Sequence, residues 1–308
     1  GYNLILSHHP VIFGGLNSIT GKTAPERVVR QAIKNDIAIY SGHTNFDAVR
    51  DGVNSAMADR LGLVHQQILD PVTGRMKKLV VFVPGDHAEQ VRAAIFEAGA
   101  GQIGAYDQCS FNVEGTGTFR GSDQSNPFVG ERGKMHREPE TRVETILPEH
   151  LAPRVVEAMI RTHPYEEVAY DLYPLDNAHN RVGMGMMGEL EDPMDEEVFL
   201  NFLKDRFRTG VIKHSELLGR PVKKVAICGG AGSFLLGRAM ARGTDVFVTA
   251  DIKYHDFFKA DGRIVIMDIG HYESEQFTRE LFYELLMKKF PKFAIRKKKK
   301  DTNPIKYF

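Results

Sequence analysis

The chain has 308 residues, which is long enough for two domains or for one core that carries an insertion. Lysine plus arginine and aspartate plus glutamate number 40 each, so no overall field attracts nucleic acid or an anionic membrane. Cys109 and Cys228 are too few for a disulfide framework or a cysteine-rich zinc site. No apolar run approaches the length of a membrane helix and no signal peptide is visible, so we expect a cytoplasmic protein.

Residues 1–70 have the pattern of an α/β unit. The chain starts Gly1-Tyr2-Asn3, without an initiating Met, directly before an apolar strand at residues 4–6, so we expect either the remnant of a tag or a missing N-terminal segment. A helix is predicted from about Pro25, because proline is favoured in the first turn and apolar residues follow at helical spacing. A second strand at residues 37–40 and a second helix at residues 53–61 complete the unit.

Residues 76–176 have a different pattern, which predicts an inserted α+β domain of ferredoxin-like type. A strand and a helix are followed by a glycine-rich passage with short strands around Phe111 and Thr118, and then by a strand, a helix and a strand. Two such β-α-β-like halves are typical of this domain type. The regular elements are expected at residues 78–83, 87–98, 142–146, 148–161 and 168–173.

From about residue 178 the α/β pattern returns and continues to residue 308. Strands are predicted at residues 184–190, 224–228, 245–249 and 263–267. Helices are predicted at residues 195–206, 233–242, 253–261 and 273–289. The predicted fold class is therefore α/β, with residues 1–70 and 178–308 forming a discontinuous two-lobed core around the inserted domain.

Three predicted strands end in polar clusters with metal-binding side chains. His8 and His9 follow the first strand, Asp47 follows the second, and His271 and Glu275 follow the strand at residues 263–267. Ligands collect beyond the carboxyl ends of strands in open α/β sheets, so these clusters can converge on one place. The alternative for each single histidine is a hydrogen-bonded structural role.

Imidazole and carboxylate ligands without thiolate suit zinc, with manganese or iron as alternatives. Glu275 follows His271 by one helical turn, so both side chains can face the same point if a helix begins there. A carboxylate in that position could bridge two ions. Five side chains are too many for one four-coordinate site, so the sequence predicts two divalent metal ions close together.

The same segments carry a family resemblance. The sequences SHHPVIF (7–13), YSGHTNFD (40–47), GVN (52–54) and DIGHYESE (268–275) resemble the NIF-three-like family, often labelled GTP cyclohydrolase I type 2 homologues. The segment TADIKYH (249–255) is also similar to that family, which usually has glycine in place of Ala250. The resemblance spans nearly the whole chain, although the family's residues ahead of the His-His strand are absent here.

The resemblance implies a dinuclear site, an assembly and an inserted domain. The family's metal ligands fall on five residues of this chain: His8, His9, Asp47, His271 and, in the bridging place, Glu275. It implies a homo-hexameric toroid whose metal sites face an inner cavity. The segments AGAGQIGAY (98–106) and HPYEEVAYD (163–171) resemble the inserted domain of longer bacterial members, which is similar to small signalling and copper-tolerance proteins.

Two functions fit these features. The first is a metal-dependent hydrolase of a nucleotide or related heterocycle, like a GTP cyclohydrolase, in which His43 or His255 moves protons. Either histidine could instead orient a metal ligand. The second is a non-enzymatic metal-binding toroidal scaffold or regulatory partner protein. Neither function requires a membrane or a long nucleic acid, and the basic run at residues 296–300 is interpreted as a solvated end.

Two further segments have open interpretations. CGGAGS (228–233) lies between a strand and a helix, where backbone amides can bind phosphate, but a plain tight turn is the alternative. HPYEE (163–167) contains histidine, tyrosine and glutamate side chains, as functional sites often do, yet we interpret the segment as structural.

Overall fold

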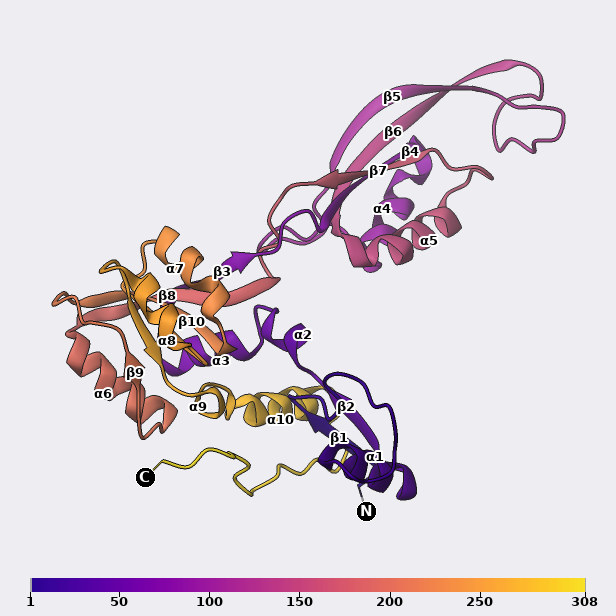
Figure 1. The fold of residues 1–308 in the computed structure, drawn as a ribbon. Helices are drawn as coiled ribbons and strands as arrows, with labels where there is room; N and C mark the ends of the chain where they lie inside the picture. The colour runs from indigo at the N-terminus through magenta and orange to yellow at the C-terminus, as the bar shows by residue number, and fades with distance from the viewer. Residues whose placement is uncertain (1, 308) are drawn as a thin grey trace. The chain divides into compact units, whose positions relative to one another are not determined.

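The structure, a computed structural model, describes residues 2–307 (Figure 1). The chain divides into two compact units. Unit 1 comprises Gly1–Pro71 and Arg181–Phe308, and unit 2 comprises Val72–Asn180. Unit 2 is thus one continuous stretch of sequence, whereas unit 1 is formed by both ends of the chain.

Unit 1 contains a six-stranded mixed sheet with the strand order β3-β8-β10-β11-β12-β9. The strands are β3 (Val64–Pro71), β8 (Gly183–Met194), β9 (Lys213–His214), β10 (Val222–Ala231), β11 (Val246–Ala250) and β12 (Val265–Asp268). The three strands β10, β11 and β12 are parallel, whereas β3, β8 and β9 join by antiparallel pairing. The carboxyl ends of the parallel strands therefore lie at one edge, where sites form in such sheets.

Both faces of this sheet are buried. Along β11, Val246 and Val248 belong to one hydrophobic cluster, whereas Phe247 belongs to another, because successive strand side chains point to opposite faces. Residues of α3 (Val53–Arg60) and α6 (Glu196–Phe207) join the first cluster. The second cluster takes residues from the turn η3 (Ser233–Leu235) and from α7 (Leu236–Ala241). The remaining helical segments of this part are α8 (Tyr254–Phe257), η4 (Phe258–Ala260), α9 (His271–Glu275) and α10 (Thr278–Lys289).

A two-stranded parallel sheet and two helices come from the start of the chain. β1 (Leu4–Ser7) pairs in register with β2 (Ala38–Ser41), so both strands end at the same level. The crossover helix α1 (Ala24–Lys34) begins with an N-cap, in which Oγ1 of Thr23 accepts from the amide of Glu26 at 3.4 Å. α2 (Thr44–Asp47) follows β2 after two residues. The segments after β1 and β2 are thereby placed side by side.

Unit 2 is a four-stranded antiparallel sheet with two helices on one face. Its strands lie in the order β5-β6-β4-β7, and the chain order of strands and helices is β-α-β-β-α-β. The elements are β4 (Met76–Pro84), η1 (Gly85–His87), α4 (Ala88–Glu97), β5 (Phe111–Arg120), β6 (Met135–Pro148), η2 (Glu149–Leu151), α5 (Ala152–Thr162) and β7 (Tyr170–Leu175). Leu79 and Val81 of β4 pack under α4 and α5, so the alternate side chains of the strand face away from the helices.

The elements differ from the predicted ones in three places. β3 occupies Val64–Pro71, for which no element is predicted, as an edge strand of the large sheet. The expected short strands around Phe111 and Thr118 are one continuous strand, because its full length pairs with β6. The expected single helix at residues 273–289 is two helices, α9 and α10. Long-range pairing, which local composition does not report, decides the first two cases.

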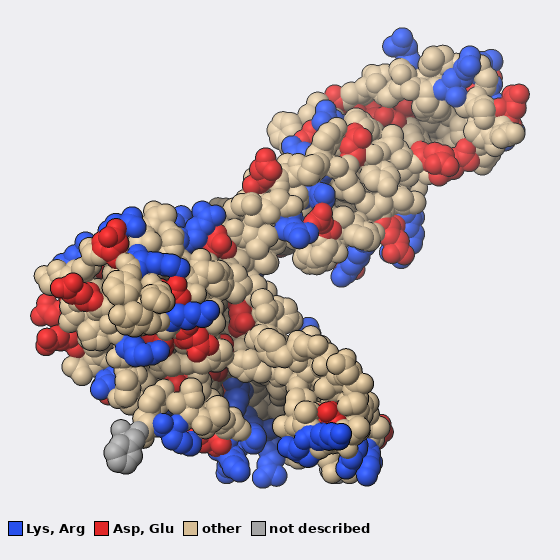
Figure 2. Space-filling model, in the orientation of Figure 1, with Lys and Arg blue, Asp and Glu red and all other residues tan. Residues whose placement is uncertain are grey.

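Lys and Arg side chains are interspersed with Asp and Glu side chains over the face shown in Figure 2, as the balanced composition predicts. No helix between residues 2 and 307 is long and apolar enough to cross a membrane.

Candidate metal centre

The structure brings the five predicted metal ligands of unit 1 together. Oε2 of Glu275 lies 3.4 Å from Nε2 of His8, 3.2 Å from Nε2 of His9 and, likewise, 3.2 Å from Nε2 of His271. Nε2 of His9 and Nε2 of His271 are 3.2 Å apart. Oδ1 of Asp47 lies 3.6 Å from Nε2 of His8. One carboxylate oxygen is thus surrounded by three imidazole nitrogens.

Helix α9 places two of these side chains. It begins directly after Gly270, whose φ of +93° lets the chain turn from the end of β12 into the helix. His271 and Glu275 are then four residues apart on the same helix face. Asp268, buried at the end of β12, accepts a hydrogen bond from the amide of Gly270 at 3.0 Å and fixes this turn.

Three atoms of the cluster are buried polar atoms with no hydrogen-bond partner within residues 2–307. They are Nε2 of His8, Oδ1 of Asp47 and Oε2 of Glu275. Unsatisfied buried polar atoms cost free energy, and most in native proteins have a partner. A divalent cation would give all three atoms a partner, so the donor set fits metal ions.

Hydrogen bonds at Nδ1, on the side away from the cluster, orient two of the imidazoles. Nδ1 of His8 donates to the carbonyl oxygen of Gly42 at 2.8 Å, and Nδ1 of His271 donates to Oδ2 of Asp251 at 2.6 Å. Each contact directs Nε2 at the cluster, where loss of its proton would leave a lone pair for a metal ion, as metal-ligating histidines require. Sequence reasoning missed Asp251, although it lies in the TADIKYH motif.

Asn54 and the glycine-rich end of β10, where the strand pairing shifts register between Ile227 and Ala231, support the carboxylates. The buried Asn54 donates to the carbonyl oxygen of Asp47 and accepts from the amide of Gly229, both at 2.9 Å. The amide of Gly230 donates to Oγ of Ser274 at 2.9 Å. Because the amides of Gly229 and Gly230 are already paired, neither is available to bind a phosphate.

Gly230 also lets the end of β10 approach the carboxylate of Glu275 closely. Its φ is +62°, and a Cβ atom there would lie 2.4 Å from Oε1 of Glu275. The neighbouring thiol of Cys228 is buried, and burial, with smaller effects of Asp47 and Glu275, raises its pKa to about 12. Cys228 also belongs to neither group of described side chains that could hold a metal ion.

The pKa values of the cluster reflect burial and mutual charge. Glu275 raises the pKa of His271 to about 9, with a smaller contribution from Asp251 and against the effect of burial. Burial alone would raise the pKa of Glu275, but His271 and His8 lower it to about 2. Burial raises the pKa of Asp47 to about 6 and lowers that of His9. Without a metal ion, a proton on the ring of His271 thus balances the negative charge of Glu275.

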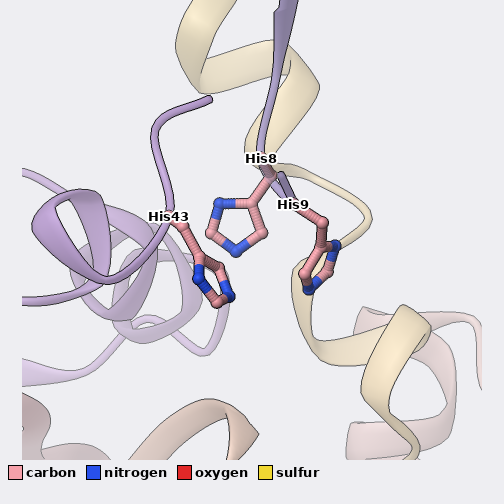
Figure 3. A group of neighbouring side chains, drawn as sticks. All are labelled: His8, His9 and His43. Atoms are coloured by element: carbon pink, nitrogen blue, oxygen red, sulfur yellow. The ribbon is translucent and has the colours of Figure 1, made fainter. Parts of the chain in front are cut away.

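His43 is a third imidazole beside the His-His pair (Figure 3). Its ring centroid lies 5.3 Å from that of His8 and 5.1 Å from that of His9. One nitrogen from each of these three rings lies within 4.8 Å of the others, so His43 could also bind a metal ion. Burial lowers the pKa of His43, which favours the neutral ring.

His255 is placed differently from the other predicted site residues. It is exposed on α8, where its ring packs edge-on against Tyr254 with centroids 5.2 Å apart. Among the described residues, His255 belongs to neither group of side chains that could hold a metal ion. The structure therefore does not bring it to the other five residues, and its predicted proton-transfer role has no support from contacts.

The cluster opens to solvent on one side. The side chain of His8 is 10% exposed and that of Glu275 is 8% exposed, whereas His9 is 47% exposed. A ligand would thus approach from the side of His9 and His271. Taken together, these features define a mixed α/β protein with a centre of histidines and carboxylates that can hold metal ions.

Comparison with known proteins identifies the family. The Duf34/NIF3 (NGG1p interacting factor 3) family profile matches residues 1–304, so the chain belongs to this family and the expected resemblance is confirmed. A GTP cyclohydrolase 1 type 2 homolog from Halalkalibacterium halodurans is 43% identical over 308 residues, covering 99% of this chain and 81% of that protein. The homolog of the same name from Bacillus subtilis is 39% identical, covering 99% and 83%.

Solved structures agree in fold. The crystal structure of a Bacillus cereus protein related to NIF3 has a TM-score of 0.84 and 39% identity, covering 99% of this chain and 83% of that one. A Staphylococcus aureus protein has a TM-score of 0.75 and 28% identity, covering 99% and 82%. The predicted mixed α/β fold of the NIF3 type is thereby confirmed.

Proposed function

We propose that this protein holds two divalent metal ions and hydrolyses a nucleotide or a related heterocycle. The observation that carries the proposal is the position of Oε2 of Glu275, buried, without a hydrogen-bond partner among residues 2–307, and within 3.4 Å of three imidazole nitrogens. A carboxylate in that position can bind two cations at once. A single four-coordinate site would not need a carboxylate that is shared in this way.

The contacts suggest how the ligands divide. His8 and Asp47 would hold one ion and His9 and His271 the other, with Glu275 between them. Nitrogen and oxygen ligands favour zinc, with manganese or iron as alternatives. Two such ions would supply Lewis acidity, which activates water and polarises the substrate.

The side chains around the ions would then orient the metal ligands and transfer protons. His43 has a lowered pKa, so its neutral ring can accept a proton beside the cluster. Asp251 holds the ring of His271 in one orientation through its 2.6 Å contact with Nδ1. The name of the relatives, GTP cyclohydrolase 1 type 2 homolog, directs the choice of substrate to guanine nucleotides and similar rings.

The test is turnover by metal-loaded protein against a panel of nucleotides, followed by chromatography of the products. We expect a metal-dependent product that is lost in His43→Ala and kept in His150→Ala, which removes an exposed imidazole of unit 2. Binding without turnover by protein shown to contain both ions would contradict the hydrolase and support a metal-binding scaffold.

We also propose an assembly and a domain class. The family resemblance suggests a homo-hexamer that admits small, nucleotide-like molecules to the metal centre. The β-α-β-β-α-β order of unit 2 supports an inserted domain of ferredoxin-like type. Light scattering at micromolar concentration should report six subunits, and a stable monomer or dimer would contradict the toroid.

A further inference from the structure

Unit 2 contains a cavity that the metal chemistry does not use. Its volume is about 730 Å³, which lies in the range typical of small-molecule sites. The cavity is formed by β5, by the hairpin segment that follows it, and by the HPYEE loop, with contributions from β4 and β6. It lies on the sheet face opposite the two helices, because Phe82 and Arg142 line it while Val81 and Val143 pack under the helices.

Two glycines form the floor of the cavity. Gly115 and Gly117 alternate on β5, so both face the same side of the sheet. A Cβ atom on Gly117 would lie only 2.1 Å from Oε2 of Glu140, whereas a Cβ atom on Gly115 would meet nothing within 4 Å. Glycine within a strand weakens it and often marks a close approach of a ligand. Gly117 thus makes room for a carboxylate, and Gly115 leaves open space.

Aromatic rings form the walls. The ring of Tyr165 lies 5.9 Å from that of Phe119 and 6.3 Å from that of Phe128, centroid to centroid. Phe82 lines the same space from β4. The side chain of Phe128 is half exposed and marks the opening. Rings at several angles around one space offer their negative faces to a cation or to another ring.

Glu140 supplies the polar end of the cavity. Its Oε1 accepts a hydrogen bond from the hydroxyl of Tyr165 at 2.9 Å. Burial, followed by the effect of Glu140, raises the pKa of Tyr165, so the phenol remains a donor. Oε2 of Glu140, which lies over Gly117, is not used by this hydrogen bond and is directed to the floor of the cavity.

The charges around the cavity favour a positive ligand. Glu140, Glu166 and Glu167 line it against Arg142, since Glu114 and Arg120 alternate with the two glycines of β5 and direct their side chains to the other face of the sheet. The guanidinium of Arg142 already pairs with Glu144 at 2.7 Å. The excess of negative charge would repel a ligand that carries a carboxylate, whereas it would attract a ligand that carries an ammonium group.

We propose that this cavity binds a small organic cation that consists of an aromatic ring and an alkylammonium group. The ring packs between Tyr165, Phe119 and Phe128, and the ammonium group donates to Glu140. This site is independent of the metal centre and of the reaction proposed there. It also gives the HPYEE segment, for which a structural role is predicted from sequence, a part in binding through Tyr165.

Tryptamine is a suitable probe, because the chain contains no tryptophan and indole fluorescence is free of protein background. Fluorescence anisotropy of tryptamine titrated with the full-length protein measures its affinity. 3-Methylindole and indole-3-acetate, read in the same way, provide a neutral and an anionic ring of similar size. We expect tryptamine to bind about tenfold more tightly than 3-methylindole, and indole-3-acetate to bind most weakly.

Two variants locate the site. Gly115→Phe directs a ring into the open space above β5 and should weaken tryptamine binding at least about tenfold, since aromatic residues suit strands and the site is blocked. Asn112→Phe, an exposed position on the same strand outside the cavity, is the matched control and should leave binding unchanged. Glu140→Gln keeps an acceptor for Tyr165 and should abolish the preference for tryptamine over 3-methylindole.

Three results would overturn the proposal. Tryptamine affinity equal in Gly115→Phe and wild type would place the binding elsewhere. Equal affinity for tryptamine and indole-3-acetate, or an undiminished preference for the amine in Glu140→Gln, would exclude a cation site. If tryptamine does not bind and Gly115→Phe instead reduces the subunit number in light scattering, a second copy of the chain fills the cavity. Glu140→Gln keeps the test decisive if Gly115→Phe does not fold.

Discussion

Asp251 and His271 form a hydrogen-bonded pair across twenty residues of sequence, with Oδ2 of Asp251 2.6 Å from Nδ1 of His271. Asp251 sits just after β11 with a φ of +55°, a conformation that most side chains avoid and that Asp and Asn adopt more readily. The unusual backbone directs its carboxylate at the ring of a metal-ligand candidate. Such a carboxylate fixes the tautomer of the histidine and raises its basicity toward a metal ion.

Asp251→Asn should weaken metal binding by about 10- to 100-fold, because the amide replaces the charged partner of His271 without changing the shape of the side chain. Competition with a chromophoric chelator measures the affinity. Asp261→Asn is a matched control, since Asp261 is exposed and has a similar φ of +49°. Equal affinities in the two variants would remove Asp251 from the metal centre.

Gly230→Ala should displace Glu275 and abolish the binding of both ions. The new Cβ atom would lie 2.4 Å from Oε1 of Glu275, in addition to a backbone cost of about 1–2 kcal/mol for a left-handed alanine. Gly62→Ala carries the same backbone cost without the collision, because its φ is +66° and its surroundings are open. Chemical denaturation of the metal-free proteins and metal analysis after loading separate the two effects. Full metal content in Gly230→Ala would show that Glu275 does not bridge.

The metal content per chain should be two, with the ions roughly 3.5–4 Å apart as in two-metal hydrolases. Glu275→Ala should lose both ions, since its carboxylate contacts the ligands of each. His9→Ala should lose mainly one ion, and His150→Ala should lose none. Native mass spectrometry of stripped and reloaded protein gives these numbers directly. One ion per chain in fully loaded wild-type protein would contradict the dinuclear centre.

Metal affinity should rise with pH. Glu275, and then Asp251, raise the pKa of His271 to about 9, so below that pH a metal ion must displace a proton from its ring. Each displaced proton makes the apparent affinity increase about tenfold per pH unit, until the ring is neutral near pH 9. Chelator competition between pH 6 and pH 9 measures the slope. In Asp251→Asn the slope should level off at a lower pH, and a flat profile in wild type would contradict proton displacement.

Several features of this protein follow from local sequence. The spacing of His271 and Glu275 implies a shared helix face, and His8 and His9 directly follow the apolar residues of β1. The apolar runs of β10, β11 and β12 predict strands buried on both faces. These patterns depend on neighbours within a few residues, so the sequence reports them.

Other features were decided only by the tertiary structure. Asn54 joins Asp47 to Gly229 from a position 175 residues away from that glycine, and no local pattern records such a contact. His255 stands in a matching motif, yet α8 leaves it exposed. The cavity of unit 2 exists because the full pairing of β5 with β6 brings Gly115 opposite Glu140. Residue type and spacing set which groups can bind a ligand, whereas packing between distant segments sets which of them meet, because burial and pairing energies are summed over the whole chain.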